Sequence, residues 1–101
     1  MASHGRTIID PDGREVVFDA GSHLHLALNR PAMLTSVETI VATVERPDYH
    51  ELDPIPGRER FFRRHVLDPM RWLRVVVDFD DEPARIVTAL VQNDDPRRRA
   101  R

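Results

Sequence analysis

The sequence contains no cysteine and no lysine, and it has no long run of apolar residues. Without cysteine the chain has no disulfide framework, no thiolate metal site and no cysteine nucleophile. A helix that spans a bilayer needs roughly 18 or more consecutive apolar residues, and the opening residues lack the basic-then-apolar order of a signal peptide. We therefore expect a cytoplasmic protein without disulfides and without a membrane segment.

Several motifs with strong chemical meaning are also missing. There is no glycine-rich phosphate loop, no Gly-x-Ser-x-Gly elbow and no His-Glu-x-x-His helix, which removes the usual signatures of nucleotide, ester and zinc chemistry. His23 and His25 are two residues apart, and on a helix this spacing points them about 200° apart, so they do not bind one metal ion together. We expect neither a metal nor a cofactor.

What the chain does contain suits one small globular domain. Its 101 residues, 41% of them hydrophobic and 32% charged, are enough for a single core and too few for two. We expect one domain over residues 1–101, with an ordered core from about residue 6 to residue 93 and a flexible, arginine-rich tail over 94–101. The sequence does not indicate an oligomeric state.

The charges are divided unequally along the chain. Residues 1–57 carry four arginines against nine carboxylates, a net charge of −5, whereas residues 58–101 carry eleven arginines against eight carboxylates, a net charge of +3. All fifteen basic residues are arginine, which the codon usage of a high-GC genome would explain. The planar guanidinium fork nevertheless binds phosphate in a bidentate way, so the second half is where we expect an anion to bind.

The first half predicts a hairpin and two helices. Short apolar runs at 7–9 and 15–18 flank an Asp-Pro-Asp-Gly turn, which predicts a β-hairpin. Asp19 is placed as the N-cap of a helix over 20–30 that Pro31 ends. Thr35 and Glu38 have the spacing of a capping box, and apolar residues at 37, 40, 41 and 44 predict a second helix that ends before Pro47.

The second half predicts strands. A proline-rich connector at 53–57 precedes strand-like runs at 58–66, 72–79 and 84–91, and the turns between them are too short for crossover helices. The expected fold is therefore α+β: an N-terminal β-hairpin, two helices, then an antiparallel sheet packed against the helices. In the middle strand Leu73, Val75 and Val77 share one face, which we expect to lie under Ile40, Val41 and Val44.

Histidine and arginine are the candidate site residues. His25 lies about 100° from Leu24 around the first predicted helix, at the border of its apolar stripe, where a half-buried structural histidine is the alternative. In the first strand after the connector, Arg58, Arg60 and Arg64 alternate on one face with Phe62, while Arg63 lies on the other. The alternative for this strand is a charged edge that faces solvent.

Six short motifs in order resemble the phage-type branch of the barnase/EndoU/colicin/RelE-like nucleases, over about residues 13–93. They are Gly13-Arg14-Glu15-Val16-Val17-Phe18, His25-Leu26-Ala27-Leu28-Asn29-Arg30-Pro31-Ala32-Met33, Arg46-Pro47-Asp48, Gly57-Arg58-Glu59-Arg60-Phe61-Phe62-Arg63-Arg64, Leu73-Arg74-Val75-Val76-Val77-Asp78 and Arg85-Ile86-Val87-Thr88-Ala89-Leu90. The sequence departs from the family at His23, where relatives usually carry tryptophan. The resemblance implies a RelE/barnase-like fold.

The resemblance also implies roles for individual residues. His25, in its His-x5-Pro segment, is the expected catalytic base; Arg60 or Arg63 is expected to bind the scissile phosphate; and Thr88 is expected to hydrogen-bond the phosphate or the reacting ribose. Expected RNA-binding residues are Arg58, Arg64 and Trp72, the last as a surface on which a base stacks, with a place in the core as its alternative.

The implied activity is that of a metal-independent endoribonuclease. A neutral His25 would take the proton of a ribose 2′-hydroxyl, whose oxygen attacks the adjacent phosphorus and leaves a 2′,3′-cyclic phosphate. His50, His65 and an arginine-bound water are open candidates for the leaving-group acid. The expected partners are an RNA substrate and, for a toxin of a toxin–antitoxin or phage-derived system, an antitoxin or immunity protein. The alternatives are a non-catalytic RNA-binding module and a protein-interaction module of the same fold.

Overall fold

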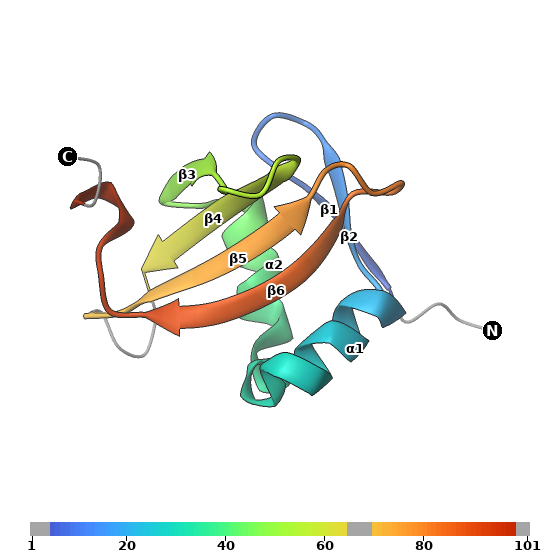
Figure 1. The fold of residues 1–101 in the computed structure, drawn as a ribbon, viewed down its shortest axis with the longest axis horizontal. Helices are drawn as coiled ribbons and strands as arrows, with labels where there is room; N and C mark the ends of the chain where they lie inside the picture. Colours follow the sequence, from blue (N-terminus) through green and yellow to red (C-terminus); the bar gives the residue numbers. More distant parts are fainter. Residues whose placement is uncertain (1–4, 65–69, 99–101) are drawn as a thin grey trace.

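Six strands and two α-helices make up the computed structural model, which describes residues 5–64 and 70–98 (Figure 1). The elements in chain order are β1 (Arg6–Ile9), β2 (Glu15–Phe18), α1 (Ala20–Asn29), a 3-10 helix (Pro31–Ser36), α2 (Val37–Glu45), β3 (Tyr49–Leu52), β4 (Arg58–Arg64), β5 (Trp72–Asp78), β6 (Arg85–Gln92) and a second 3-10 helix (Pro96–Arg98). The predicted α+β class is confirmed.

One sheet contains all six strands in the order β1-β2-β6-β5-β4-β3. The predicted antiparallel meander of β4, β5 and β6 is confirmed, and β3 extends it along the outer edge of β4. The hairpin joins the same sheet by a parallel contact that the sequence did not predict, in which Val17 pairs with Arg85 and donates its N–H to the carbonyl of Ala84 at 2.9 Å. The sheet is therefore mixed.

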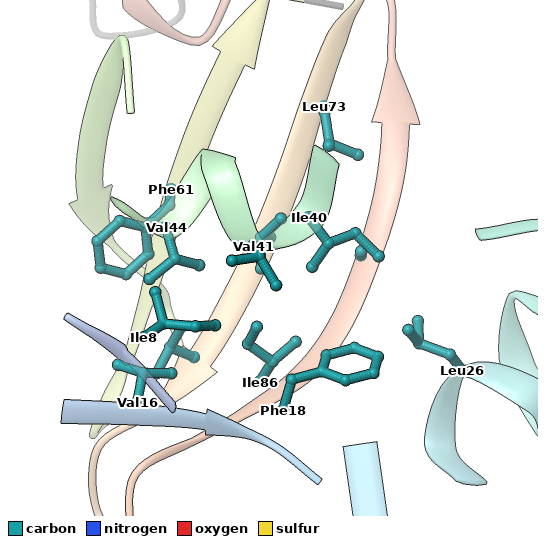
Figure 2. Close-up of a cluster of buried hydrophobic side chains, with 13 residues drawn as sticks. Ile8, Val16, Phe18, Leu26, Ile40, Val41, Val44, Phe61, Leu73 and Ile86 are labelled. Carbon is teal, nitrogen blue, oxygen red and sulfur yellow. The ribbon is translucent and has the colours of Figure 1, made fainter. Parts of the chain in front are cut away.

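The core lies between the helices and one face of this sheet. Leu73, Val75 and Val77 of β5 are buried in one cluster with Ile40, Val41 and Val44 of α2, as predicted (Figure 2). Apolar side chains at alternate positions of a strand and at i, i+3 and i+4 positions of a helix meet in this way when the helix packs across the sheet. Phe18 at the end of β2 and Leu26 of α1 continue the same cluster.

The start of α1 agrees with the prediction from the sequence, whereas the start of α2 differs from it. Asp19 caps α1 as predicted, in a reciprocal capping box with Ser22. The predicted capping box placed the start of the second helix at Thr35, whereas a 3-10 helix runs directly into α2 and Ser36 occupies the N-cap position without a side-chain cap. Among the described helices, none is long and apolar enough to cross a membrane.

The last described residues form a short turn within the segment predicted to be a flexible tail. Residues 96–98 form a 3-10 helix in which Pro96 is buried, and Asp95 accepts hydrogen bonds from the backbone and side chain of Arg97. The predicted extension of the first long strand to residue 66 lies outside the described residues. The chain thus brings Arg97 back to Trp72, at the start of β5.

Candidate functional site

The face of β4, β5 and β6 that points away from the core cluster is not covered by α2 (Figure 1). It mixes arginines with apolar side chains, of which Phe62, Val76 and Trp72 are buried. The strand register sets its side chains in four rows across the three strands. We call these rows the open face: Arg58–Asp78–Arg85, Arg60–Val76–Thr88, Phe62–Arg74–Leu90 and Arg64–Trp72–Gln92. Directly opposed residues share a face, so the open face gathers arginines from all three strands.

Five of the seven predicted site residues lie on the open face: Arg58, Arg60, Arg64, Trp72 and Thr88. Arg63 does not lie on the open face, because it is three positions after Arg60, and side chains three positions apart in a strand point to opposite faces. Its guanidinium donates instead to the carbonyl of Ala42 in α2, at 3.4 Å. The structure thus separates Arg63 from Thr88, and the expectation that Arg63 can meet a phosphate beside Thr88 is wrong.

Arg60 shares a row with Thr88 but is bound to carboxylates on its other side. Its Nε lies 2.7 Å from Asp53 and its Nη1 lies 3.2 Å from Glu51. Burial alone would lower the pKa of Arg60, but these two carboxylates raise it above its ordinary value. Because Glu51 belongs to β3, the guanidinium is drawn away from β5 and β6, and its charge is already neutralised.

Arg74 is the arginine that the register brings next to Thr88, and the sequence did not single it out. It lies two residues from Val76, the direct partner of Thr88, so the two side chains are diagonal neighbours on adjacent strands. Long side chains reach across this diagonal, whose length is about 7–8 Å. The signal was present in the alternation of β5, which puts a charged residue between Trp72 and Val76 in the middle of the sheet.

His25 lies on α1, which runs beside the part of β6 that continues past its pairing with β2 at Arg85. The helix starts next to the strand, because the Asp19 carboxylate caps the Ser22 N–H at 3.1 Å and forms an ion pair with Arg85 at 3.0 Å. Burial alone would raise the pKa of Asp19, but these contacts lower it below its ordinary value. The Asp19 carboxylate is therefore the fixed point from which α1 extends.

The two elements run in the same direction from this anchor (Figure 1). At about 1.5 Å per helical residue, His25 is about 9 Å beyond Asp19. Thr88 is three residues beyond Arg85, and because a bulge falls between them this span is about 7–10 Å at about 3.3 Å per strand residue. Measured along the two elements, His25 therefore comes roughly level with Thr88. Its side chain is exposed, and within the described residues its ring makes no hydrogen bond or ion pair.

Trp72 forms a stack with arginines at one end of the open face. The guanidinium carbons of Arg64 and Arg97 lie over its ring, 4.7 Å and 5.0 Å from the centroid, and together with their neighbours they leave the residue only 3% exposed. A hollow of about 470 Å³ opens beside the stack, lined by Arg64, Met70, Trp72, Asn93, Asp94, Asp95 and Arg98. The structure thus brings together two of the residues predicted to bind RNA.

Of the histidines predicted as leaving-group acids, the structure describes only His50, which does not lie near Thr88. His50 belongs to β3 and pairs with Phe61, whose side chain lies in the core cluster, so it is on the face opposite to Thr88. Its ring stacks on Phe61 at 4.4 Å and its Nε2 lies 2.6 Å from Glu59. His65 lies outside the described residues. Among the residues that are described, no group of three histidines or carboxylates is arranged to hold a metal ion.

None of the family models, curated proteins or solved structures compared with the chain matches it. The resemblance to the nuclease family therefore stays a prediction, and the function has to be argued from the site itself. The site offers a hydroxyl on β6, a guanidinium on β5, an imidazole level with the hydroxyl on α1, and an aromatic stack at the end of the same face. These groups suit the binding of a phosphodiester chain that carries flat bases.

Proposed function

We propose that the chain is an endoribonuclease that cleaves RNA on the open face through attack by the ribose 2′-hydroxyl. The observation that carries the proposal is the position of Thr88, which has Arg74 as its diagonal neighbour on β5 and comes level with His25 on α1. A phosphate beside Thr88 would have a hydrogen-bond donor, a cation and a base around it. These are the three kinds of group that the transesterification requires.

Each group has one task in this scheme. The Thr88 hydroxyl donates a hydrogen bond to a non-bridging oxygen of the scissile phosphate. Arg74 offsets the additional negative charge that develops on that phosphate when the 2′-oxygen attacks. The neutral imidazole of His25 accepts the 2′-hydroxyl proton as the 2′-oxygen bonds to phosphorus. The P–O5′ bond breaks and the 5′-oxygen takes a proton from solvent water, so the products are a 2′,3′-cyclic phosphate and a 5′-hydroxyl. The attacking oxygen is part of the substrate, so the reaction needs no metal-bound water.

Arg60 and Arg58 take supporting positions in this proposal. Both are tied to carboxylates, Arg60 to Asp53 and Glu51 and Arg58 to Asp78 at 3.4 Å. Arg58 and Arg60 lie on β4, one strand farther from Thr88 than Arg74, which is the diagonal neighbour of Thr88 on β5. We therefore assign the phosphate contact to Arg74 and leave RNA binding along the chain to Arg64 and Trp72.

The test is RNA cleavage by wild type and by His25→Asn in the presence of EDTA. Asparagine fills much of the same space but takes no proton at neutral pH, so the rate should fall by about 10²- to 10⁴-fold. His23→Asn is the matched control, because His23 is on the same helix but packs edge-on against Phe18 at 5.0 Å. An RNA with a single 2′-deoxy sugar at the cleavage site should resist both the wild type and the control. Equal cleavage of that deoxy substrate would overturn the mechanism.

A second function, RNA binding without cleavage, is favoured by one observation. A general base is usually oriented by a third group, and within the described residues nothing holds the His25 ring. Electrophoretic shift of RNA that depends on salt, with no cleavage at any concentration of wild type, would select this function.

The proposal includes a protein partner. An endoribonuclease in the cytoplasm attacks the RNA of its own cell, so we propose an antitoxin or immunity protein that covers the open face. Expression of the wild type alone should stop growth, and His25→Asn should not. Normal growth with active wild-type protein and no partner present would argue against this part of the proposal.

A further inference from the structure

We infer that the hollow beside Trp72 is a nucleobase-binding subsite. Residues 94–98, here called the C-terminal turn, cover the indole until a base displaces Arg97 from it. The inference rests on the proposed RNA-directed function and specifies how RNA is held beyond the reacting phosphate. It concerns the contact between Trp72 and Arg97, which takes no part in the chemistry at Thr88.

Trp72 is buried in an unusual way. It lies outside the core cluster, on the open face, and arginine side chains rather than apolar ones lie over its ring. A large aromatic side chain on a sheet face without a covering helix would otherwise be exposed to water. The C-terminal turn therefore acts as a cover, and Arg97 occupies a position where a planar group stacks on the indole.

A base can replace Arg97 at small cost. Guanidinium and nucleobase are both flat, and stacking of a base on tryptophan is the stronger of the two contacts when the cation is exposed to solvent. Arg97 also keeps its second partner when it moves, because Asp95 receives its Nε at 3.1 Å and its Nη2 at 2.9 Å. These bonds lower the pKa of Asp95 to about 2, so the anchor stays ionised under ordinary conditions.

The rest of the hollow suits a nucleotide rather than an apolar ligand. Its volume of about 470 Å³ falls in the usual range for small-molecule sites. Arg64 lies at the same ring and lines the hollow, and the exposed Arg98 lines it as well, so each can approach the phosphate attached to a stacked base. The base must be unpaired, because the edges and faces of bases in a duplex are not available for stacking. The subsite therefore selects single-stranded RNA.

The only tryptophan of the chain reports directly on this subsite. We would titrate wild type with a 2′-O-methyl RNA hexamer, which cannot be cleaved, and follow the fluorescence of Trp72. Saturable quenching is expected, and a hexamer of abasic sugar-phosphate should bind about 5- to 100-fold more weakly. Equal affinity for the two hexamers would overturn the inference, as would quenching by an RNA duplex of the same sequence.

Variants separate displacement of Arg97 from simple attraction of charge. With a 5′-labelled 2′-O-methyl hexamer and fluorescence anisotropy, Arg97→Ala should bind RNA as tightly as wild type or more tightly, because the cover is removed. Arg64→Gln should bind more weakly, and Arg6→Gln, which removes an arginine paired with Glu38 at the other edge of the sheet, should bind as wild type does. Weaker binding by Arg97→Ala would show that Arg97 holds the phosphate, and it would overturn the displacement.

The result is independent of catalysis. Base-dependent quenching without cleavage of natural RNA would support the subsite and refute the proposed nuclease. Cleavage without base-dependent quenching would refute the subsite and leave the nuclease proposal intact.

Discussion

Arg63 and Arg74 make a natural pair for testing the open face, because they lie on adjacent strands but on opposite faces of the sheet. Arg74→Gln should lower the single-turnover rate of RNA cleavage by about 10²- to 10³-fold, the usual effect of removing one group that stabilises transition-state charge. RNA affinity should fall much less. Arg63→Gln should leave the rate near that of wild type, and its effect should appear in thermal stability, because its bond to α2 is lost. Equal loss of rate in the two variants would contradict this assignment.

Glu59 predicts how the protein responds to acid. Hydrogen bonds from Arg14, at 3.0 Å and 2.9 Å, are the main reason that the pKa of Glu59 lies below its ordinary value of 4.5. The pKa is then lower in the folded than in the unfolded chain, so the carboxylate stabilises the fold at neutral pH. That contribution is lost as the pH falls below about 4.5 and through the folded pKa.

Urea unfolding at pH 7 and at pH 3 measures this effect. Glu59→Gln should reduce the free energy of unfolding at pH 7 and make it less dependent on pH, because glutamine does not titrate. Glu38→Gln is the matched control, since Glu38 is largely exposed and its ion pair with Arg6 is a surface contact. A pH dependence in Glu59→Gln as steep as that of wild type would refute the role assigned to Glu59.

At the scale of elements, α1 depends on one side chain at its start. Asp19→Ala removes both the N-cap and the ion pair with Arg85, and it should lower the free energy of unfolding by about 1–2 kcal/mol. Asp19→Asn keeps a good cap and removes only the charge, so its loss of stability should be smaller. Denaturation curves of the two variants measure the difference.

The position of His25 gives a second measurement on the same variants. Since Asp19 fixes the start of α1 against β6, both substitutions should slow RNA cleavage by more than their effect on the folded fraction explains. A rate that follows the folded fraction alone would show that the anchor does not position His25.

The elements that the sequence predicted best are those with a strong apolar period. The pattern of α2 at 37, 40, 41 and 44 and the alternation of β5 both led to the observed core, because burial of one face determines the register of each element. The four residues of β3 carry no such pattern and lie between proline-containing segments. Since β3 was not predicted, the carboxylate partners of Arg60 could not be predicted either, and the expectation of Arg60 or Arg63 at the phosphate came from the family resemblance. Alternation alone predicted that Arg58 and Arg64 share a face of their strand, but that Trp72 and Thr88 lie on the same face depends on the register between strands, which only the structure shows.

At the scale of the whole molecule, the division of charge along the sequence becomes a division in space. The basic half forms β4, β5 and β6, and the acidic half supplies Glu51 of β3 and Asp19, the N-cap of α1, whose carboxylates hold Arg60 and Arg85. Arginines that already have carboxylate partners release few counterions when RNA binds. We therefore expect a shallow salt dependence, with about two to three phosphates neutralised and a slope of roughly −2 in a plot of log affinity against log salt.

Titration of a single-stranded RNA between 50 mM and 200 mM salt would test this expectation. A slope much steeper than −2 would mean that the ion pairs of the open face break on binding. A slope near zero would mean that phosphates are not recognised at all.

The junction between β2 and β6 also determines the order in which the chain can be completed. Val17 pairs with Arg85, so the hairpin joins the sheet only after residue 85 has been made. During translation the residues of β1 and β2 emerge before the sheet that they join, whereas α2, β3, β4 and β5 pack against elements close to them in sequence. Contacts between distant residues form late because closing the long loop costs entropy. A ribosome stalled before residue 85 should therefore display an undocked hairpin with an exposed strand edge, which makes this stage of synthesis the one at which the chain is most prone to aggregate or to be captured by a chaperone.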